Sequence, residues 1–306
     1  MSQLREAVLL VNGKSRRGRD LYDAAHLRLV DAGFHFHKAG AFRQMDQLLG
    51  LVDDAIRSEI PLIVVGGGDG TLSSVAQKLI GTKTTLGVLP LGTGNAFARD
   101  LGISPDLNLA LPVIMSGETR MVDLGEANGS VFVNIASVGL TTEIAKSLDP
   151  TLKRTLGKAA YIAAVWRALA RVKPFWVTLS TENGLAKFET LQVVIGCGRF
   201  HAGPFQLSEA ASIDSGKLSL YALQTARKSA LLKLALNLTF GHHGRLEEVH
   251  TEETAGGTLR TDPKRKVTVD GEISQRTPLE FKILPAALRV LVPHSADISP
   301  MSEQSV

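Results

Sequence analysis

The sequence predicts an α/β protein in two parts, an N-terminal doubly wound α/β domain followed by a β-rich antiparallel sandwich domain. Over residues 1–124, short apolar runs alternate with amphipathic helical patterns, the order typical of a parallel sheet covered on both faces. Two of these apolar runs end in glycine-rich turns, as strands do where a sheet binds ligands. From about Gly125 the pattern changes to short strands at hairpin spacing.

Composition indicates a protein with a large core. The chain has 306 residues, 44% of them hydrophobic, which is enough for two domains. Arg167 and Lys233 interrupt the longest apolar runs, so none reaches the roughly 18 apolar residues of a membrane-spanning helix. Arg5 and Glu6 precede the first apolar run, unlike the charge pattern of a signal peptide.

Cysteine content and net charge give limited information on the cellular compartment and on the class of ligand. The single cysteine, Cys197, excludes a disulfide framework and fits a reducing cytoplasm. We expect it to be a small buried residue and not a nucleophile. The net charge of +4 is compatible with nucleotides, nucleic acid or an anionic membrane surface, and does not choose among them.

The first predicted strand, residues 7–11, runs into a basic loop at 12–19. A Gly-Lys-Ser sequence in this loop suggests a Walker A motif. That motif requires a glycine where Val8 stands, so a P-loop is excluded.

Two helices and a short strand follow. Helices are predicted at residues 20–32 and 45–56, the second from apolar residues at i, i+3, i+4, i+7 and i+11. A short strand is expected at 34–36.

The third predicted strand, residues 62–65, ends in the sequence Gly-Gly-Gly-Asp-Gly-Thr at 66–71. Thr71 is expected to cap the helix that follows. Glycines let backbone N–H groups approach phosphate oxygens, and a helix N-terminus favours negative charge. Asp69 would repel phosphate unless a metal ion or water mediates, which indicates a Mg-nucleotide site.

A second turn of this kind, at residues 91–95, follows the apolar strand that starts at Leu86. The carboxyl ends of neighbouring parallel strands meet at one edge of a sheet, so the two turns should lie side by side. A dinucleotide-binding G-x-G-x-x-G motif is excluded because Thr71 stands where its third glycine is needed. The residues expected to contact nucleotide in these turns are Gly66, Gly67, Gly68, Asp69, Gly70, Thr71, Gly92, Thr93, Gly94 and Asn95.

The paired sequences GGGDGT and PLGTGNAFAR resemble the diacylglycerol kinase catalytic-domain family, which includes soluble bacterial lipid kinases and is related to sphingosine and ceramide kinases. Weaker similarity runs from about Leu9 to Val292. NAD kinases share the GGDGT turn but lack the second sequence. The resemblance implies an α/β ATP-binding domain at 1–124, to which the tail at 293–306 can return, and a β-rich lipid-acceptor domain at 125–292.

The resemblance also implies roles for individual residues. Asn12 and Ser15 match the family's Asn-Pro-x-Ser-Gly loop and would contact phosphate, although a solvated basic loop stays an alternative. In the Asp-Gly-Glu sequence at 270–272, Glu272 matches the family's proton acceptor, with Asp270 as its neighbour or alternative. From the residues alone, Asp-Gly between alternating strands is first a type I′ hairpin turn. A carboxylate pair can also hold one pKa near neutrality, which a general base needs.

A further family feature is an x-Asp-Gly-x-Leu loop that binds a structural Mg²⁺. Here Ser215 occupies the usual aspartate position, and Asp214 lies one place before it. Lys217 follows two places after Ser215. These three residues are the candidate metal loop, and a plain Asp-Ser-Gly turn is the alternative. The eight histidines, including the pair at 242–243 and His250, match no standard metal spacing.

The second part of the chain is expected to be mostly strands. Two apolar basic segments, 151–173 and 230–240, are expected to be helices that either pack between domains or lie on a membrane surface. The expected strands are 131–136, 175–181 paired with 187–195, 217–223, 247–254, 264–269, 279–284 and 288–292.

Together these features predict an ATP- and Mg²⁺-dependent transferase that moves the γ-phosphoryl group of ATP to the hydroxyl of a diacylglycerol-like lipid, in lipid metabolism and phospholipid biosynthesis. In the active site, Asp69 would contact the metal ion or the nucleotide. We expect a cytoplasmic protein, peripheral at the inner face of the membrane, with ATP, a lipid alcohol and a transient membrane surface as partners and no nucleic acid. The sequence does not identify the lipid, and a homodimer stays open. The alternatives are a kinase of a soluble alcohol such as NAD and a non-catalytic nucleotide-sensing module.

Overall fold

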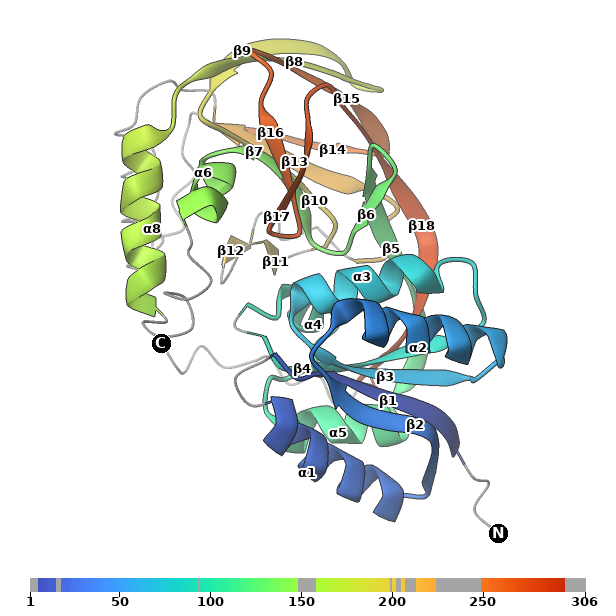
Figure 1. The fold of residues 1–306 in the computed structure, drawn as a ribbon. Helices are drawn as coiled ribbons and strands as arrows, with labels where there is room; N and C mark the ends of the chain where they lie inside the picture. The colour runs from blue at the N-terminus through green and yellow to red at the C-terminus, as the bar shows by residue number, and fades with distance from the viewer. Residues whose placement is uncertain are drawn as a thin grey trace. The chain divides into compact units, whose positions relative to one another are not determined.

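The fold is described from a computed structural model (Figure 1). The structure describes residues 5–14, 18–92, 94–147, 158–198, 200–201, 205–206, 213–223 and 249–294. The chain divides into two compact units. Unit 1 comprises Met1–Asp123 and Ala286–Val306, and unit 2 comprises Leu124–Pro285.

Unit 1 is built on a parallel sheet whose strands lie in the order β2-β1-β3-β4-β18. Val11 pairs with Gly66 and Gly66 pairs with Leu89, so β1, β3 and β4 end at the same edge. The strands are β1 (Arg5–Asn12), β2 (Phe34–Phe42), β3 (Leu62–Gly67), β4 (Thr85–Pro90) and the last part of β18 (Leu279–Val292).

Helices cover both faces of this sheet (Figure 1). Helix α1 (Gly18–Asp31) packs beside α5 (Leu107–Ser116), and α2 (Met45–Arg57) packs beside α3 (Asp69–Leu79). The short helix α4 (Ala96–Asp100) follows β4. The apolar periodicity of α2 matches its burial, since Leu48, Val52 and Ala55 are its buried residues. The predicted doubly wound α/β architecture is therefore confirmed.

Unit 2 is an antiparallel sandwich, as predicted. One sheet has the order β14-β13-β10-β7-β16-β17, and the other is formed by the last part of β5, by β6, β8, β9 and β15, and by the first part of β18. Its strands are β5 (Glu118–Ala127), β6 (Ser130–Phe132), β7 (Ile135–Gly139), β8 (Phe175–Thr181), β9 (Gly184–Thr190), β10 (Gln192–Gly196), β13 (Leu218–Leu223), β14 (Val249–Thr254), β15 (Gly256–Asp262), β16 (Lys266–Val269) and β17 (Glu272–Arg276).

Apolar side chains of both sheets share one core, which includes Phe175 and Leu259 from one sheet and Val193 and Leu220 from the other. Two helices, α6 (Leu140–Ser147) and α8 (Lys158–Arg171), pack together beside it. A small hairpin joins β11 (Phe200–His201) and β12 (Phe205–Gln206). No helix among the described residues is long and apolar enough to cross a bilayer.

The predicted strand limits in unit 2 needed correction. Strand β8 pairs with residues 184–190, and not with 187–195, because the chain passes to the other sheet at the buried Leu191. The structure also contains β15 and β17, which the sequence analysis missed, and β18 is one strand instead of two. Gly257 of β15 is required by close pairing, since a Cβ atom there would lie 2.4 Å from the Ser180 carbonyl oxygen.

The boundary between the units also differs from the expected one. The sequence assigns residues 125–292 to the second domain, whereas 286–292 belong to unit 1, because Val290 pairs with Leu86 of β4. The backbone N–H of Ala286 donates to Asp123 Oδ1 at 2.8 Å within this unit. The expected helix at 230–240 and the tail beyond His294 lie outside the described residues.

A carboxylate that links the β8–β9 hairpin turn to the β14–β15 connection gives a pH-dependent prediction. Glu182 accepts hydrogen bonds from Thr254 Oγ1 and from the Ala255 N–H, and these bonds hold its pKa below the ordinary value of 4.5. Because the folded-state pKa is the lower one, this stabilisation is present above pH 4.5 and is lost as the pH falls through the folded-state pKa. Urea unfolding of Glu182→Gln should show lower stability at pH 7 and a smaller loss on acidification than wild type. Glu253→Gln, at an exposed position on β14, should retain the wild-type acid dependence.

Candidate active site

The two glycine turns of unit 1 are in direct backbone contact. A Cβ atom on Gly92 would lie 2.6 Å from the Cα atom of Gly68, a distance that real Cβ contacts do not reach. The Leu91 N–H also donates to the Gly67 carbonyl at 2.9 Å. The turns that the sequence analysis expected to be neighbours therefore touch, and only glycine fits at the point of contact.

The first turn is held by a hydrogen bond between a side chain of β1 and a side chain of α3. Asn12 Nδ2 donates to Thr71 Oγ1 at 2.8 Å, and Asn12 Oδ1 accepts the Lys14 N–H at 3.0 Å. A Cβ atom on Gly67 would lie 2.6 Å from that of Thr71. Thr71 is buried inside α3 and is not its N-cap, which is Gly68, so the expected capping role was wrong. The helix starts three residues earlier because three glycines allow the chain to turn directly from the strand.

The start of α3 presents unused donors. Its N-cap, Gly68, provides no side-chain hydrogen bond. Among the described residues, no acceptor binds the backbone N–H groups of Gly68, Asp69 or Gly70, whereas the Thr71 N–H donates to the Gly68 carbonyl. Together with the partial positive charge of a helix N-terminus, these N–H groups suit an anionic ligand such as phosphate.

Asp69 and Asn95 hold the two turns in place. Asp69 Oδ1 accepts the N–H of Phe97, the second residue of α4, at 3.1 Å. Asn95 is buried in a left-handed conformation with φ 48°, and its side chain bonds both the N–H and the carbonyl of Gly92, at 2.8 and 2.9 Å. Asn95 therefore closes the second turn internally. Of the other expected nucleotide contacts, Gly94 packs near Asp69 Oδ2, and Ser15 and Thr93 lie outside the described residues.

In unit 2, Asp270 anchors the β16–β17 hairpin. Its Oδ2 accepts the Val133 N–H at 2.8 Å, and its Oδ1 accepts the N–H groups of Asn134 and Ile135, both at 3.0 Å. Asp270 and Gly271 have φ values of 43° and 89°, the positive values of a type I′ turn. Both carboxylate oxygens of Asp270 are thus engaged by the backbone, and a positioning role fits this residue better than proton transfer.

Glu272 has a different environment. It is the first residue of β17, its side chain is exposed, and it has no hydrogen bond or ion pair with another described residue. The rigid turn ahead of it fixes where its backbone lies while its carboxylate stays accessible. Of the two acidic residues in this sequence, Glu272 therefore has the more accessible carboxylate.

The candidate metal loop forms a compact turn at the start of β13. Ser215 Oγ accepts the Lys217 N–H at 3.4 Å and donates to the Lys217 carbonyl at 3.3 Å. Asp214 is exposed and the preceding Ile213 is buried. An exposed carboxylate beside turn carbonyls could hold Mg²⁺, but the Ser215 hydroxyl is already used within the turn.

A different group of possible metal ligands escaped the sequence analysis. Glu6 on β1 and His35 and His37 on β2 offer ligand atoms within 4.8 Å of one another, the only such group among the described residues. A hydrogen bond with His35, supplemented by His37, lowers the pKa of Glu6. Glu6 is half-buried and both histidines are exposed, and the contacts are hydrogen bonds between the Glu6 carboxylate and the two imidazole rings. The i, i+2 spacing of the histidines was visible, but the parallel partner strand was needed to add Glu6.

The chain is similar to known lipid kinases along nearly its whole length. Residues 6–127 match the family model described as diacylglycerol kinase catalytic domain, and residues 134–292 match the YegS C-terminal NAD kinase beta sandwich-like domain. The chain is 30% identical to a protein named "Probable lipid kinase YegS-like" from Klebsiella pneumoniae (strain 342), over 96% of this chain and 98% of that protein. It is also 30% identical to a diacylglycerol kinase of Bacillus subtilis (strain 168), over 78% of this chain and 80% of that one.

The fold has solved counterparts. A crystal structure of a diacylglycerol kinase from Bacillus anthracis str. Sterne superimposes with a TM-score of 0.76, covering 97% of this chain and 100% of the other at 22% identity. The similarity extends through both units of the chain.

The contact between the glycine turns makes Gly92→Ala a direct test of the geometry. The new methyl group would meet the backbone of Gly68 and Asn95 Oδ1, neither of which can move without opening a turn. We expect the free energy of unfolding to fall by about 1–3 kcal/mol. Gly50→Ala is the matched control, since a Cβ atom there meets nothing within 4 Å and should stabilise α2 by up to about 1 kcal/mol. Equal effects of the two substitutions in urea unfolding would contradict the contact.

The anchoring role of Asp270 can be tested by comparing amide substitutions. Asp270→Asn replaces one acceptor oxygen with an NH₂ group that faces a backbone donor, so we expect a loss of about 2–3 kcal/mol of stability. Glu272→Gln, at the exposed neighbouring position, should change stability by no more than about 0.5 kcal/mol. Thermal or urea unfolding of both variants measures the difference, and an unchanged Asp270→Asn protein would exclude the anchor.

Proposed function

Because the chain belongs to the diacylglycerol kinase catalytic-domain family, we propose that it transfers the γ-phosphoryl group of ATP to the hydroxyl group of a diacylglycerol-like lipid. The family supports a phosphotransferase with an alcohol acceptor. The observation that carries the nucleotide part is the backbone contact between the two glycine turns beside the open N–H groups of α3.

In this proposal the turns of unit 1 bind the phosphates of ATP. The N–H groups of Gly68, Asp69 and Gly70 donate to phosphate oxygens, and the missing side chains at 66–68 and Gly92 let the phosphates approach the backbone. Asn12 and Thr71 contribute by fixing the first turn, and Asn95 by fixing the second. Binding is thus mainly by backbone groups, which do not depend on side-chain rotamers.

The residues present also fit Mg²⁺ at the nucleotide. Asp69 Oδ1 is occupied by the Phe97 N–H, but Asp69 Oδ2 has no hydrogen bond with a described residue and is an oxygen ligand of the kind Mg²⁺ prefers. When bound, the ion neutralises charge on the β- and γ-phosphates. A second, structural Mg²⁺ is proposed at the loop of Asp214, Ser215 and Lys217, with the Asp214 carboxylate and turn carbonyls as ligands.

Glu272 is the proposed proton acceptor. Its carboxylate takes the proton of the lipid hydroxyl as the hydroxyl oxygen forms its bond to the γ-phosphorus. The bond from that phosphorus to the bridging oxygen breaks, and ADP leaves with the bonding electrons. The products are a lipid phosphate, ADP and the proton held by Glu272. Asp270 acts as a positioning residue through its three backbone hydrogen bonds.

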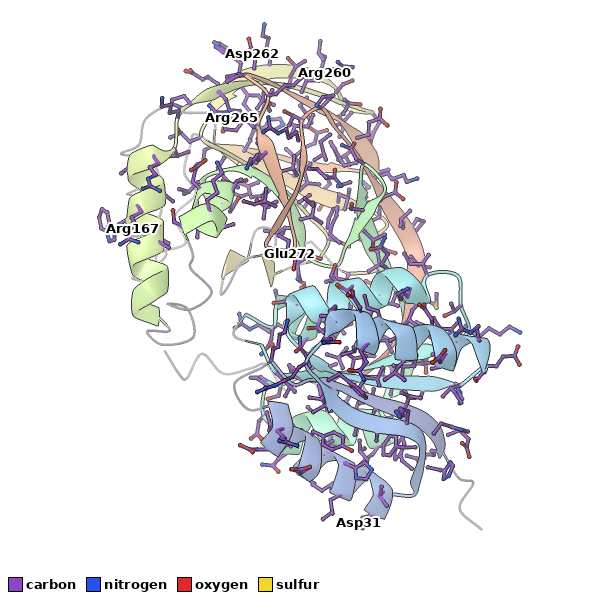
Figure 2. The ribbon with its side chains drawn as sticks, in the orientation of Figure 1. Asp31, Arg167, Arg260, Asp262, Arg265 and Glu272 are labelled. Carbon is purple, nitrogen blue, oxygen red and sulfur yellow. The ribbon has the colours of Figure 1, made fainter. Side chains whose placement is uncertain are left out.

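A lipid acceptor requires transient contact with a membrane, and α8 has a suitable surface. Trp166 is 57% exposed and Arg171 is exposed on this helix. Arg167, also exposed, is labelled on α8 in Figure 2. Indole rings and cations of this kind favour the headgroup region of an anionic bilayer. We therefore propose a cytoplasmic enzyme that associates peripherally with the inner face of the membrane.

A soluble acceptor such as NAD is the second candidate, because the family model matched by residues 134–292 is described as NAD kinase beta sandwich-like. Both candidates use the same nucleotide turns and the same base. Only the identity of the phosphorylated alcohol separates them.

The decisive test is transfer of labelled γ-phosphate from ATP to a panel containing diacylglycerol, monoacylglycerol, a sphingoid base, phosphatidylglycerol and NAD. We expect label in a lipid with Mg²⁺ present, none after chelation, and a loss of about 10²–10⁴-fold in Glu272→Gln, as for removal of a general base. Asp69→Ala should also be inactive. Glu280→Gln, which neutralises another exposed glutamate of unit 2, should keep wild-type activity.

Two results would contradict the lipid kinase. Label in NAD alone would make the protein a kinase of a soluble alcohol. Binding of ATP without transfer to any acceptor would indicate a nucleotide sensor.

A further inference from the structure

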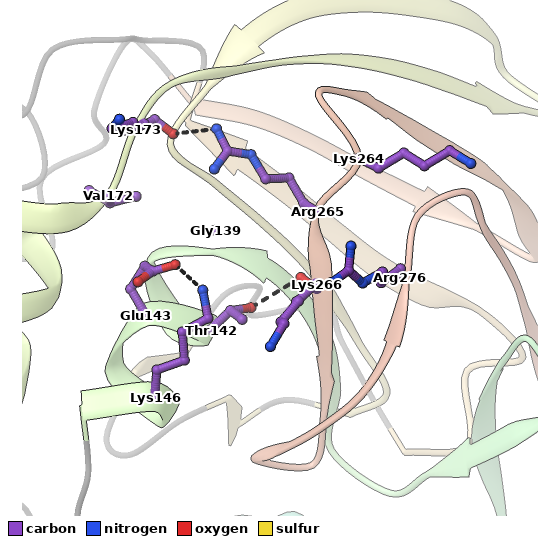
Figure 3. A pocket seen from close by; sticks show the side chains of 10 residues that line it. All are labelled: Gly139, Thr142, Glu143, Lys146, Val172, Lys173, Lys264, Arg265, Lys266 and Arg276. Atoms are coloured by element: carbon purple, nitrogen blue, oxygen red, sulfur yellow. Dashed lines mark hydrogen bonds and ion pairs between the residues drawn. The ribbon is translucent and has the colours of Figure 1, made fainter.

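Unit 2 contains a cavity of about 190 Å³ whose lining is strongly cationic (Figure 3). It is bordered by α6, by the segment ahead of β8 and by the β16–β17 hairpin. Its six cationic residues are Lys146, Lys173, Lys264, Arg265, Lys266 and Arg276, and its one carboxylate is Glu143. The cavity lies wholly in unit 2, whereas the glycine turns lie in unit 1.

Most of this positive charge has no carboxylate partner among the residues that the structure describes. Lys146 pairs with Glu143 (Figure 3). None of the other five cations forms an ion pair with a carboxylate among the described residues. Lys266 and Arg276 are also direct partners across β16 and β17, a placement of like charges that destabilises a sheet. An anion bound between these side chains would remove the repulsion.

Arg265 is already held in place for such a ligand. Its Nη2 donates to the carbonyls of Lys173 and Pro174 at 3.2 and 3.0 Å, and its guanidinium carbon lies 5.0 Å from the centre of the Phe175 ring. Its Nε is buried and has no hydrogen-bond partner among the residues that the structure describes. A buried donor without an acceptor is costly, and an anion bound in the cavity could supply an acceptor to Arg265 Nε.

The cavity is separate from the proposed proton acceptor. Lys266 and Arg276 form the first pair of the hairpin, and Val269 and Glu272 form the last before the turn. Figure 2 shows Arg265 and Glu272 at opposite ends of this hairpin. At a rise of about 3.3 Å per residue, the two ends are roughly 10 Å apart. A ligand in the cavity would therefore not be the hydroxyl that Glu272 deprotonates.

We propose that this cavity binds the phosphate group of a phosphate ester. Phosphate offers several oxygens at tetrahedral angles, which match convergent lysines and the planar donors of arginine. The group could belong to a phospholipid headgroup or to a soluble phosphate ester, since both present the same chemistry. The inference concerns binding and does not require the kinase reaction.

The test compares two double variants with the same loss of charge. Lys266→Gln/Arg276→Gln removes two cavity cations with exposed side chains, and Lys83→Gln/Arg289→Gln removes two exposed cations of unit 1. Inorganic phosphate and glycerol 1-phosphate are titrated by calorimetry, and vesicles of phosphatidylcholine with and without phosphatidylglycerol by co-sedimentation. Thermal unfolding checks that both variants are folded.

We expect wild type to bind at least one of these probes, the cavity variant to bind it at least tenfold more weakly, and the control variant to stay within twofold. If the cavity variant loses binding only to phosphatidylglycerol vesicles, the ligand is a phospholipid headgroup. If it loses binding to the soluble probes, the ligand is a soluble phosphate ester. The proposal is overturned if wild type binds neither kind of probe, or if both variants bind equally well. Glu272→Gln should bind as wild type does, so a failure of the kinase proposal would leave this result intact.

Discussion

The architecture of unit 1 depends on a close contact between two glycine backbones. Gly68 and Gly92 approach so closely that a methyl group on Gly92 has no space and one on Gly68 would be tightly packed, and this is possible because β3 and β4 are adjacent parallel strands that end together. The contact brings two helix starts next to each other. Asp69 then connects them by accepting the Phe97 N–H, and Asn95 closes the second turn. Side chains here mainly position backbone donors, and those donors are the groups that we propose bind phosphate.

In unit 2, too, a side chain fixes the backbone of a turn, and here the side chain is a carboxylate. Asp270 accepts three consecutive backbone N–H groups and so fixes a hairpin turn, leaving Glu272 at the first position of the next strand without a partner among the described residues. One acid of the pair supports the structure and the other is accessible. The Asp-Gly-Glu sequence therefore combines a hairpin turn with an accessible carboxylate. The two interpretations of this sequence, a type I′ turn and a proton acceptor, are compatible.

The sequence predicted the features set by local pattern. Apolar runs, helical periodicity and the two turns were enough for the doubly wound sheet, the sandwich and the neighbouring position of Gly68 and Gly92. It failed where tertiary pairing overrides local preference. Strand β15 begins with Gly256 and Gly257, which disfavour a strand in isolation but are needed for close pairing on both sides. The cationic cavity was not foreseen because Lys146 and Arg276 are far apart in the chain and are brought together only by folding.

The central claim is that backbone N–H groups of the first glycine turn bind the phosphates of ATP. It is tested most directly by a crystal structure of the protein with Mg²⁺ and a non-hydrolysable ATP analogue. We predict phosphate oxygens within hydrogen-bonding distance of the N–H groups of Gly68, Asp69 and Gly70, with Mg²⁺ near Asp69 Oδ2. Nucleotide bound at any other place, with these N–H groups facing only water, would contradict the account.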